Sequence, residues 1–179
     1  MEKIILKKAE EKDALKVHKI TKRAFDLYAK EVRKRESISA LYETVDDVIE
    51  DIRHKHVYIV SIDDEVVGSV RFQVLPEAIA YLSRFAMDPD TQNLGIGGLL
   101  LEKVKLECIS MGVRAITLHT ASKMRSTVAF YLKNGYYIHS ISKDADYIRA
   151  FMVNELCEMD EMFDYESVVS AVTGGHAKI

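Results

Sequence analysis

The sequence predicts an α/β fold in which helices flank a mixed β-sheet, and three observations indicate this class. A strand-like run at residues 80–87 is followed by a turn, a glycine-rich segment at 92–98 and a long amphipathic helix. Apolar and polar residues alternate along 66–75, as they do in a strand with one buried face. The length of 179 residues suits one domain with a sizeable core.

The first half of the chain is expected to contain three strands after two helices, with one short strand before them. The charged stretch 30–37 is expected to be exposed, either as a helix end or as a loop. Asp63-Asp64 suits a tight turn between two strands, and Pro76-Glu77 breaks the second of them. In chain order the expected elements are a strand at 4–6, helices at 10–28 and 45–53, and strands at 57–62, 66–75 and 81–87.

The second half continues with a helix at 97–111, whose apolar positions fall on one side and whose charged positions fall on the other. A strand at 115–120, a helix at 124–133 and two closing strands at 136–141 and 146–153 complete the set. The order is therefore β-α-α-β-β-β-α-β-α-β-β, with about seven strands and about four helices.

Residues 155–179 are expected to be an acidic extension of the domain formed by 1–154. Met159, Phe163 and Val168 are spaced to line one side of a short helix, and the tail after it is expected to be loose. Two interpretations remain open: a solvated acidic helix, or a segment that packs on a partner subunit or borders the substrate site.

Charge and composition exclude several classes of protein. A net charge of −3 is not the basic balance of a dedicated nucleic-acid binder. No apolar stretch approaches the length of a membrane span, and the first residues do not follow the plan of a signal peptide. Cys108 and Cys157 fit no metal-binding spacing, so no metal is expected, and both are interpreted as reduced thiols of a cytoplasmic protein.

The glycine-rich segment Gln92-Asn93-Leu94-Gly95-Ile96-Gly97-Gly98 is the strongest functional signal. Such a turn at the start of a helix exposes backbone N–H groups, and the helix dipole adds positive potential, so the turn can hold a phosphate. A P-loop would need Lys and then Ser or Thr after its last glycine, and a dinucleotide fingerprint would need glycine where Leu100 stands. The pattern that remains is Q-x-x-G-x-G. A purely structural helix start is a weaker explanation of these glycines, because Ser, Thr or Asp cap a helix better than glycine does.

This pattern resembles the pyrophosphate-binding motif of the GNAT superfamily of acyl-CoA-dependent N-acyltransferases. The segment 123–136 is similar to the second signature of that family, N-x-x-A-x-x-x-Y-x-x-x-G-F. Tyr131, Gly135 and Tyr136 match it, whereas Met124 and Thr127 stand where Asn and Ala are usual. The resemblance covers residues 56–153 and implies a GNAT-like, mostly antiparallel sheet and acetyl-CoA as the acyl donor.

The resemblance implies which residues would hold the donor. The strand ending Phe85-Ala86-Met87 would bulge and splay from its neighbour, so that its backbone pairs with the pantetheine arm. A plain core strand is the alternative. Met124 removes a side-chain hydrogen bond to that arm, and Ser126 or Arg125 is placed to compensate. The cofactor-binding residues implied are Phe85, Ala86, Met87, Gln92, Asn93, Leu94, Gly95, Ile96, Gly97, Gly98, Met124, Ser126 and Tyr131.

The family's chemistry needs an acid for the leaving thiolate and a base for the attacking amine. By resemblance Tyr131 is the general acid, because a phenol has a pKa near that of an alkyl thiol, about 10; the plain alternative is a core aromatic residue. The usual base positions hold Tyr81 and Ser83, which are poor bases. His119 is the candidate base, with Glu77 and a relay of waters as alternatives.

The acceptor is expected to lie against Tyr28, Tyr42, Tyr81 and Ser83, and acidic groups such as Glu43 could attract a cationic amine. The expected reaction is direct transfer of an acetyl group from acetyl-CoA to a primary amine of a small molecule, an amino acid derivative or a peptide. A homodimer is possible by analogy with the family.

Two other functions stay open at this point. The chain could be a non-catalytic acyl-CoA sensor, because the strand base and the usual Asn are missing. It could also be a nucleotide-binding protein that only shares the glycine turn, although the second motif conflicts with that interpretation.

Overall fold

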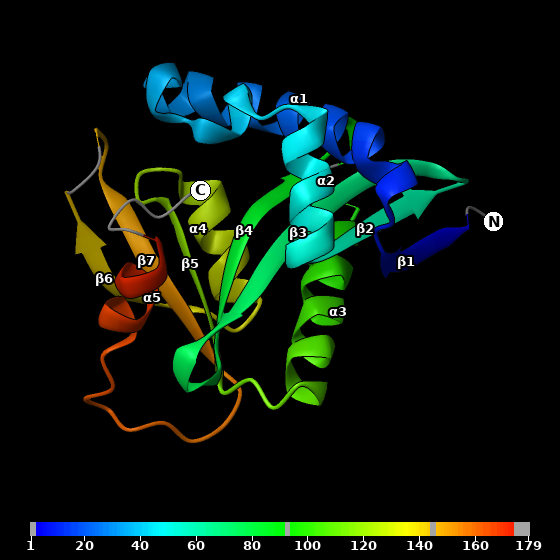
Figure 1. The fold of residues 1–179 in the computed structure, drawn as a ribbon. Coiled ribbons are helices and arrows are strands. Elements are labelled where there is room, and N and C mark those ends of the chain that lie inside the picture. Colours follow the sequence, from blue (N-terminus) through cyan, green and yellow to red (C-terminus); the bar gives the residue numbers. More distant parts are fainter. Residues whose placement is uncertain (1–2, 92–93, 144–145, 174–179) are drawn as a thin grey trace.

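The computed structural model describes residues 3–91, 94–143 and 146–173. They form one sheet of seven strands in the order β1-β2-β3-β4-β5-β7-β6, in which only β4 and β5 run parallel (Figure 1). The strands are β1 (Ile4–Lys8), β2 (His56–Ile62), β3 (Glu65–Leu75), β4 (Ile79–Met87), β5 (Ala115–Ala121), β6 (Tyr137–Ser142) and β7 (Arg149–Glu155). The predicted mixed, mostly antiparallel α/β fold and its strand order along the chain are confirmed.

Within the described residues, five α-helices cover the two faces of the sheet: the four expected before residue 154 and a short one in the acidic extension. The helices are α1 (Ala14–Val32), α2 (Val45–His54), α3 (Ile96–Ser110), α4 (Arg125–Lys133) and α5 (Tyr165–Thr173), with short 3-10 turns named η1 to η5 between some elements.

Local chemistry explains where several elements begin and end. The side chain of Thr44 accepts a hydrogen bond from the N–H of Asp47, and the Asp47 carboxylate accepts one from the N–H of Thr44, so a capping box starts α2. Arg33 ends α1 in the left-handed conformation, and the charged stretch 30–37 is therefore partly the end of this helix. Asp63 and Asp64 both have positive φ, as the type I′ turn of a tight hairpin requires.

The strand β4 bulges and then separates from β5. Ser69 and Arg71 of β3 pair with Ala86 and Ser83 of β4, so Arg84 and Phe85 together stand opposite one β3 residue. Arg84 adopts φ +53°, which is uncommon outside glycine. The parallel pairing with β5 covers only Ile79 to Tyr81, after which the strands diverge (Figure 1). The bulge and splay expected from the family resemblance are present, and the plain core strand is wrong.

Alternate residues of each strand face two different helix layers. Tyr58 and Val60 of β2 pack into the main core with α3 and α4, whereas Val57 and Ile59 pack against α1 and α2. The α5 helix lies on the same face as α1 and α2, but farther along the sheet, over β4 and β7. The pocket described below opens where β4 leaves β5.

The acidic extension is a covering layer of the sheet. Tyr165 and Val169 of α5 are each 2% exposed and pack against Tyr81 and Phe151. Met159, Phe163 and Val168 lie half-buried beside the same cluster, but only Val168 belongs to α5, so the prediction that all three line one helix is wrong. The interpretation as a solvated helix is wrong, because its apolar side covers the core of its own chain. The expected loose tail at Gly174-Gly175 lies outside the described residues.

Within the described residues, no helix is long and apolar enough to span a membrane. The described part of the chain also contains no cluster of His, Cys, Asp or Glu side chains suited to a metal ion.

Candidate active site

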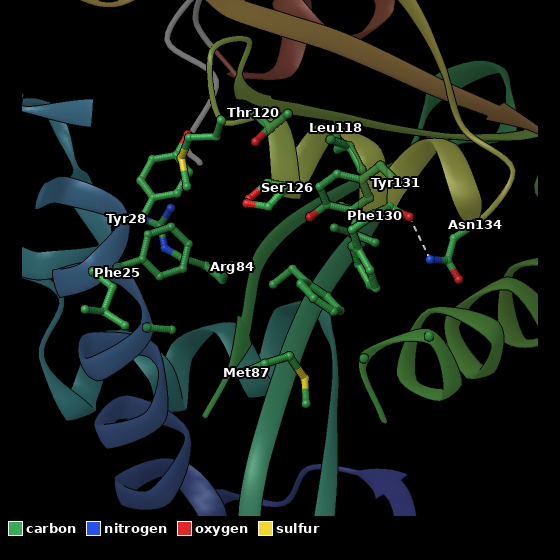
Figure 2. Close-up of a pocket in the computed structure, with 18 of the residues that line it drawn as sticks. Phe25, Tyr28, Arg84, Met87, Leu118, Thr120, Ser126, Phe130, Tyr131 and Asn134 are labelled. Carbon is green, nitrogen blue, oxygen red and sulfur yellow. Dashed lines mark hydrogen bonds between the residues drawn. The ribbon is translucent and has the colours of Figure 1, made fainter. Parts of the chain in front are cut away.

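A cavity of about 810 Å³ opens in the gap between the diverging strands β4 and β5 (Figure 2). Its walls come from α1, β4, the start of α3, the end of β5, and α4. It is lined by Ala24, Phe25, Leu27, Tyr28, Lys30, Glu31, Leu82, Ser83, Arg84, Phe85, Met87, Thr91, Gly95, Ile96, Gly97, Gly98, Leu118, His119, Thr120, Met124, Ser126, Thr127, Phe130, Tyr131, Lys133 and Asn134.

The glycine turn forms one end of this pocket. Gly95 adopts φ +78° immediately before α3, a conformation that glycine adopts without strain. The N–H groups of Gly98 and Leu99 donate to the Gly95 carbonyl, while within the described residues those of Ile96 and Gly97 have no acceptor. Free N–H groups at a helix start are suited to bind a diphosphate.

Gly97 also permits close packing at the turn, because a Cβ there would lie 3.3 Å from the Phe130 ring and 3.4 Å from the Phe85 ring. Leu94 is 62% exposed and is not among the lining residues. The expected contributions of Gln92 and Asn93 concern residues outside the described part of the chain.

The second wall is the free edge of β4 beyond Tyr81. Phe85 and Met87 line the pocket, whereas Ala86 is buried against Phe25 of α1. Any contact from Ala86 to a donor molecule would therefore come from its backbone. A strand edge whose N–H and C=O groups lack a neighbouring strand can pair with the amides of an extended pantetheine arm.

Tyr131 lies at the centre of an aromatic cluster on α4. Its ring contacts those of Phe130, Phe85 and Tyr136, with centroids 5.4 to 6.1 Å away. Figure 2 shows its hydroxyl directed into the pocket, on the side of Ser126. Burial, with smaller contributions from Tyr28 and Tyr81, raises the pKa of Tyr131 well above its ordinary value. The phenol is therefore protonated at neutral pH and able to donate.

Met124 and Ser126 lie where the second motif places them, on the pocket wall at the start of α4. Met124 occupies the N-cap position of this helix and makes no side-chain capping bond. Its thioether cannot donate a hydrogen bond, unlike the amide of the usual Asn. The hydroxyl of Ser126 is the nearby polar group that faces the cavity (Figure 2).

His119 of β5 also lines the pocket, and its Nδ1 lies 3.2 Å from the hydroxyl of Tyr81. Burial raises the pKa of Tyr81, although Arg149 and Arg84 act in the opposite direction. Tyr81 itself is not a lining residue and therefore supports His119 from behind. Glu77, the alternative base, lies in the turn η4 (Pro76–Ala78) before β4, largely exposed and near Arg114. It does not line the pocket, so its prediction as a base there is wrong.

The four residues expected on the acceptor side differ in their placement. Tyr28 and Ser83 line the pocket, and the Tyr28 hydroxyl accepts a hydrogen bond from the N–H of Ala121 at 2.8 Å. Burial raises the pKa of Tyr28. Tyr42 is 65% exposed and lies outside the lining, because the short turn η3 (Ser39–Tyr42) directs Leu41 inward instead. The structure therefore does not support Tyr42 as an acceptor contact.

Arg84 is a pocket residue that the sequence analysis did not select. Its Nε donates to Glu43 Oε1 at 2.6 Å, and its Nη2 donates to Ser39 Oγ at 3.0 Å. Glu43 also accepts from both terminal nitrogens of the fully buried Arg71. Glu43 therefore holds two arginines together, and its expected role in attracting an amine is wrong. A charged residue inside the apolar run 79–87 was the signal that could have pointed to Arg84.

The chain resembles known acetyltransferases in sequence and in structure. The sequence model of the Acetyltransferase (GNAT) family matches residues 17–136, more than half of the chain. An S-(2-succino)cysteine N-acetyltransferase of Bacillus subtilis (strain 168) is 26% identical over 137 residues, which are 72% of this chain and 81% of that protein.

Solved structures share the fold at lower identity. The PaiA N-acetyltransferase of Thermoplasma acidophilum, solved in complex with coenzyme A, superposes with a TM-score of 0.76 at 15% identity, covering 86% of this chain and 99% of that one. The ribosomal-protein-S18-alanine N-acetyltransferase of Escherichia coli gives a TM-score of 0.70 at 18% identity, covering 91% and 100%.

The family match, the glycine turn and the splayed strand agree with one another. Together they show that the chain belongs to the GNAT family and is an acetyl-CoA-dependent N-acetyltransferase.

Proposed function

We propose that the acceptor is the primary amine of a small molecule, most specifically of an amino acid derivative. Two observations support this acceptor class. The pocket continues past the donor walls to α1, where Tyr28 and Ser83 line a space for a small polar ligand and Ser83 adds a hydroxyl group. The related B. subtilis protein is named for an amino acid derivative, S-(2-succino)cysteine.

The geometry that carries this function is one pocket between the glycine turn, the free edge of β4 and Tyr131. The turn would bind the diphosphate, the β4 edge would pair with the pantetheine arm, and the N–H of Met87 would polarise the thioester carbonyl. The amine would attack that carbon directly, without a covalent enzyme intermediate. Tyr131 would then give its proton to the departing sulfur, which in the same dry surroundings is a stronger base than in water.

His119 is the base in this proposal. When Nδ1–H donates to the phenol oxygen of Tyr81, Nε2 carries no proton and can take one from the ammonium form of the acceptor. Tyr81 would then fix the tautomer and the ring orientation. A cytoplasmic location is proposed with it, since Cys108 and Cys157 are both free thiols.

The test is a turnover assay with acetyl-CoA and a panel of amines: S-(2-succino)cysteine, free amino acids, spermidine and a peptide with N-terminal alanine. We expect acceptor-dependent release of the CoA thiol with amino acid derivatives, and mass spectrometry should find an added acetyl group on the amine. A protein that binds acetyl-CoA by calorimetry but releases no thiol with any acceptor would be a sensor, and the proposal would be wrong.

The role of His119 is tested separately with His119→Gln and Tyr81→Phe. We expect His119→Gln to remove the acid limb of the pH profile and to lower kcat, whereas Tyr81→Phe should lower kcat less. An unchanged pH profile in His119→Gln would mean that solvent water, and not His119, takes the proton from the ammonium form of the acceptor.

A further inference from the structure

A network of ion pairs lies behind the wall of the pocket next to α1 and reaches that wall through Arg84. Three cations, Arg71, Arg84 and Lys55, share two carboxylates, Glu43 and Asp51, at distances of 2.6 to 3.0 Å. Glu43 bridges the two arginines, and Asp51 bridges Arg71 and Lys55. Each carboxylate thus contacts two cations, so the network carries one net positive charge, with Arg71 and Arg84 buried and Lys55 24% exposed.

Arg84 is the member of this network that faces the pocket. The bulge of β4 inserts Arg84 as the extra residue, so its side chain leaves toward α1 and η3 while Phe85 packs toward α4. Figure 2 shows the guanidinium on the same side of the cavity as Phe25 and Tyr28, which also line it. Arg71 is fully buried and is not a lining residue.

The guanidinium of Arg84 is only partly satisfied. It is 4% exposed, and its Nη1 has no hydrogen-bond partner within the described residues, although Nε and Nη2 are both bonded. Buried donors in proteins are almost always paired, so an unpaired one on a residue that lines a cavity indicates a polar partner there, either a water or a ligand group. Burial lowers the pKa of Arg84 even with Glu43 beside it, which agrees with an incompletely compensated charge.

We propose that Arg84 binds a carboxylate of the acceptor, so that the enzyme selects amines that also carry a carboxylate. This inference rests on the proposed function. A guanidinium presents planar, parallel N–H groups that match a carboxylate, and the added anion would balance the network. The donor's phosphates have their own site at the glycine turn on α3, whereas Arg84 points to the face of α1. The acceptor carboxylate is therefore the anion that reaches Arg84.

The decisive experiment needs only the wild-type protein. Acetyl transfer is measured for S-(2-succino)cysteine as the reference acceptor and for two matched sets, methionine and phenylalanine, each against its carboxamide and its decarboxylated amine. We expect kcat/KM to favour the acceptor with a carboxylate by about 100-fold. The reason is that the Nη1 group of Arg84 stays unpaired when the carboxamide or the decarboxylated amine is bound. Equal or better rates with the decarboxylated amines would overturn the inference and leave the proposed function intact. Binding of acetyl-CoA with no transfer to any of them would overturn both.

Variants of Arg84 distinguish recognition of the acceptor carboxylate from a purely structural role of this residue. Arg84→Gln should raise the KM for the carboxylate acceptor and abolish its preference over the decarboxylated amine, while the KM for acetyl-CoA stays the same. Arg84→Lys should retain part of the preference. Arg71→Lys is the matched control, since Arg71 shares Glu43 but does not line the pocket. An equal loss of rate with both acceptor types in Arg84→Lys would show a purely structural arginine.

Discussion

Tyr131 shows how the surroundings of one residue determine what it can do. Because burial raises the pKa of its phenol, Tyr131 keeps its proton at neutral pH. We expect Tyr131→Phe to lower kcat by about 10²-fold, the lower range for loss of a general acid. We also expect the affinity for acetyl-CoA to stay unchanged, as measured by calorimetry.

The pH dependence provides a second test of the same residue. A group with a raised pKa loses its proton only at higher pH, so ionisation of Tyr131 should cause no loss of kcat up to about pH 10. Tyr136→Phe is the control, because Tyr136 belongs to the same aromatic cluster but does not line the pocket. Equal losses in the two variants would indicate a packing role for both tyrosines.

Glu43 determines the stability of the buried ion pairs. Glu43→Gln would leave Arg71 and Arg84 without their shared anion, and breaking a buried pair in this way costs about 3–5 kcal/mol. The free energy of unfolding from urea titration should fall accordingly. Glu50→Gln, which removes an exposed carboxylate on α2, should change it by less than about 1 kcal/mol. Similar values for both variants would contradict the assigned role.

The contrast between Tyr131 and Arg84 shows which site residues a sequence can indicate. Tyr131 is found because its spacing to Gly135 within one helix and turn is local. Arg84 depends on a bulge that redirects its side chain and on partners 41 and 45 positions away, at Glu43 and Ser39. The prediction of Tyr42 as an acceptor contact is wrong for a similar reason, because the exposed side of a short turn cannot be deduced from composition alone.

At the scale of elements, the two ends of α3 allow a matched comparison. Gly95 and Gly112 both have positive φ and both have open space where a Cβ would stand. Gly95→Ala and Gly112→Ala should therefore destabilise the protein alike, by about 1–2 kcal/mol.

Only Gly95→Ala should also affect the donor, because it distorts the turn beside the pocket. We expect its Kd for acetyl-CoA to rise about tenfold by calorimetry, which corresponds to about 1.4 kcal/mol. An equal change of Kd in Gly112→Ala would mean that the turn does not bind the diphosphate.

The α5 helix illustrates what an element's own pattern leaves open. Its apolar side is visible in the sequence, but the surface that it covers is formed by β4 and β7, far away in the chain. We expect Tyr165→Ala to lower the free energy of unfolding by about 3–5 kcal/mol, as for other large buried aromatics. Val172→Ala, at a half-exposed position on the same helix, should have little effect. An equal change in the free energy of unfolding in both variants would mean that α5 does not cover the core.

The whole molecule consists of two groups of strands that meet along a short boundary. Among the residues that the structure describes, the group β1 to β4 and the group β5 to β7 are joined in the sheet only by Ile79 to Tyr81 pairing with Ala115 to Thr117. When acetyl-CoA binds, we expect slower hydrogen exchange of the backbone amides in 82–87, measured by mass spectrometry, because the pantetheine arm would occupy that edge. Protection confined to α5 would contradict the proposed position of the donor.

This narrow boundary predicts that the stability of the folded enzyme depends on the concentration of its donor. A ligand that bridges both groups stabilises the folded state by mass action, by about 2.7 kcal/mol at a hundredfold excess over its Kd. Because β4 and β5 pair only over Ile79 to Tyr81, we expect the chain without its donor to open more often and to be cut faster by a protease. The cellular amount of this acetyltransferase should therefore rise and fall with the supply of its own donor.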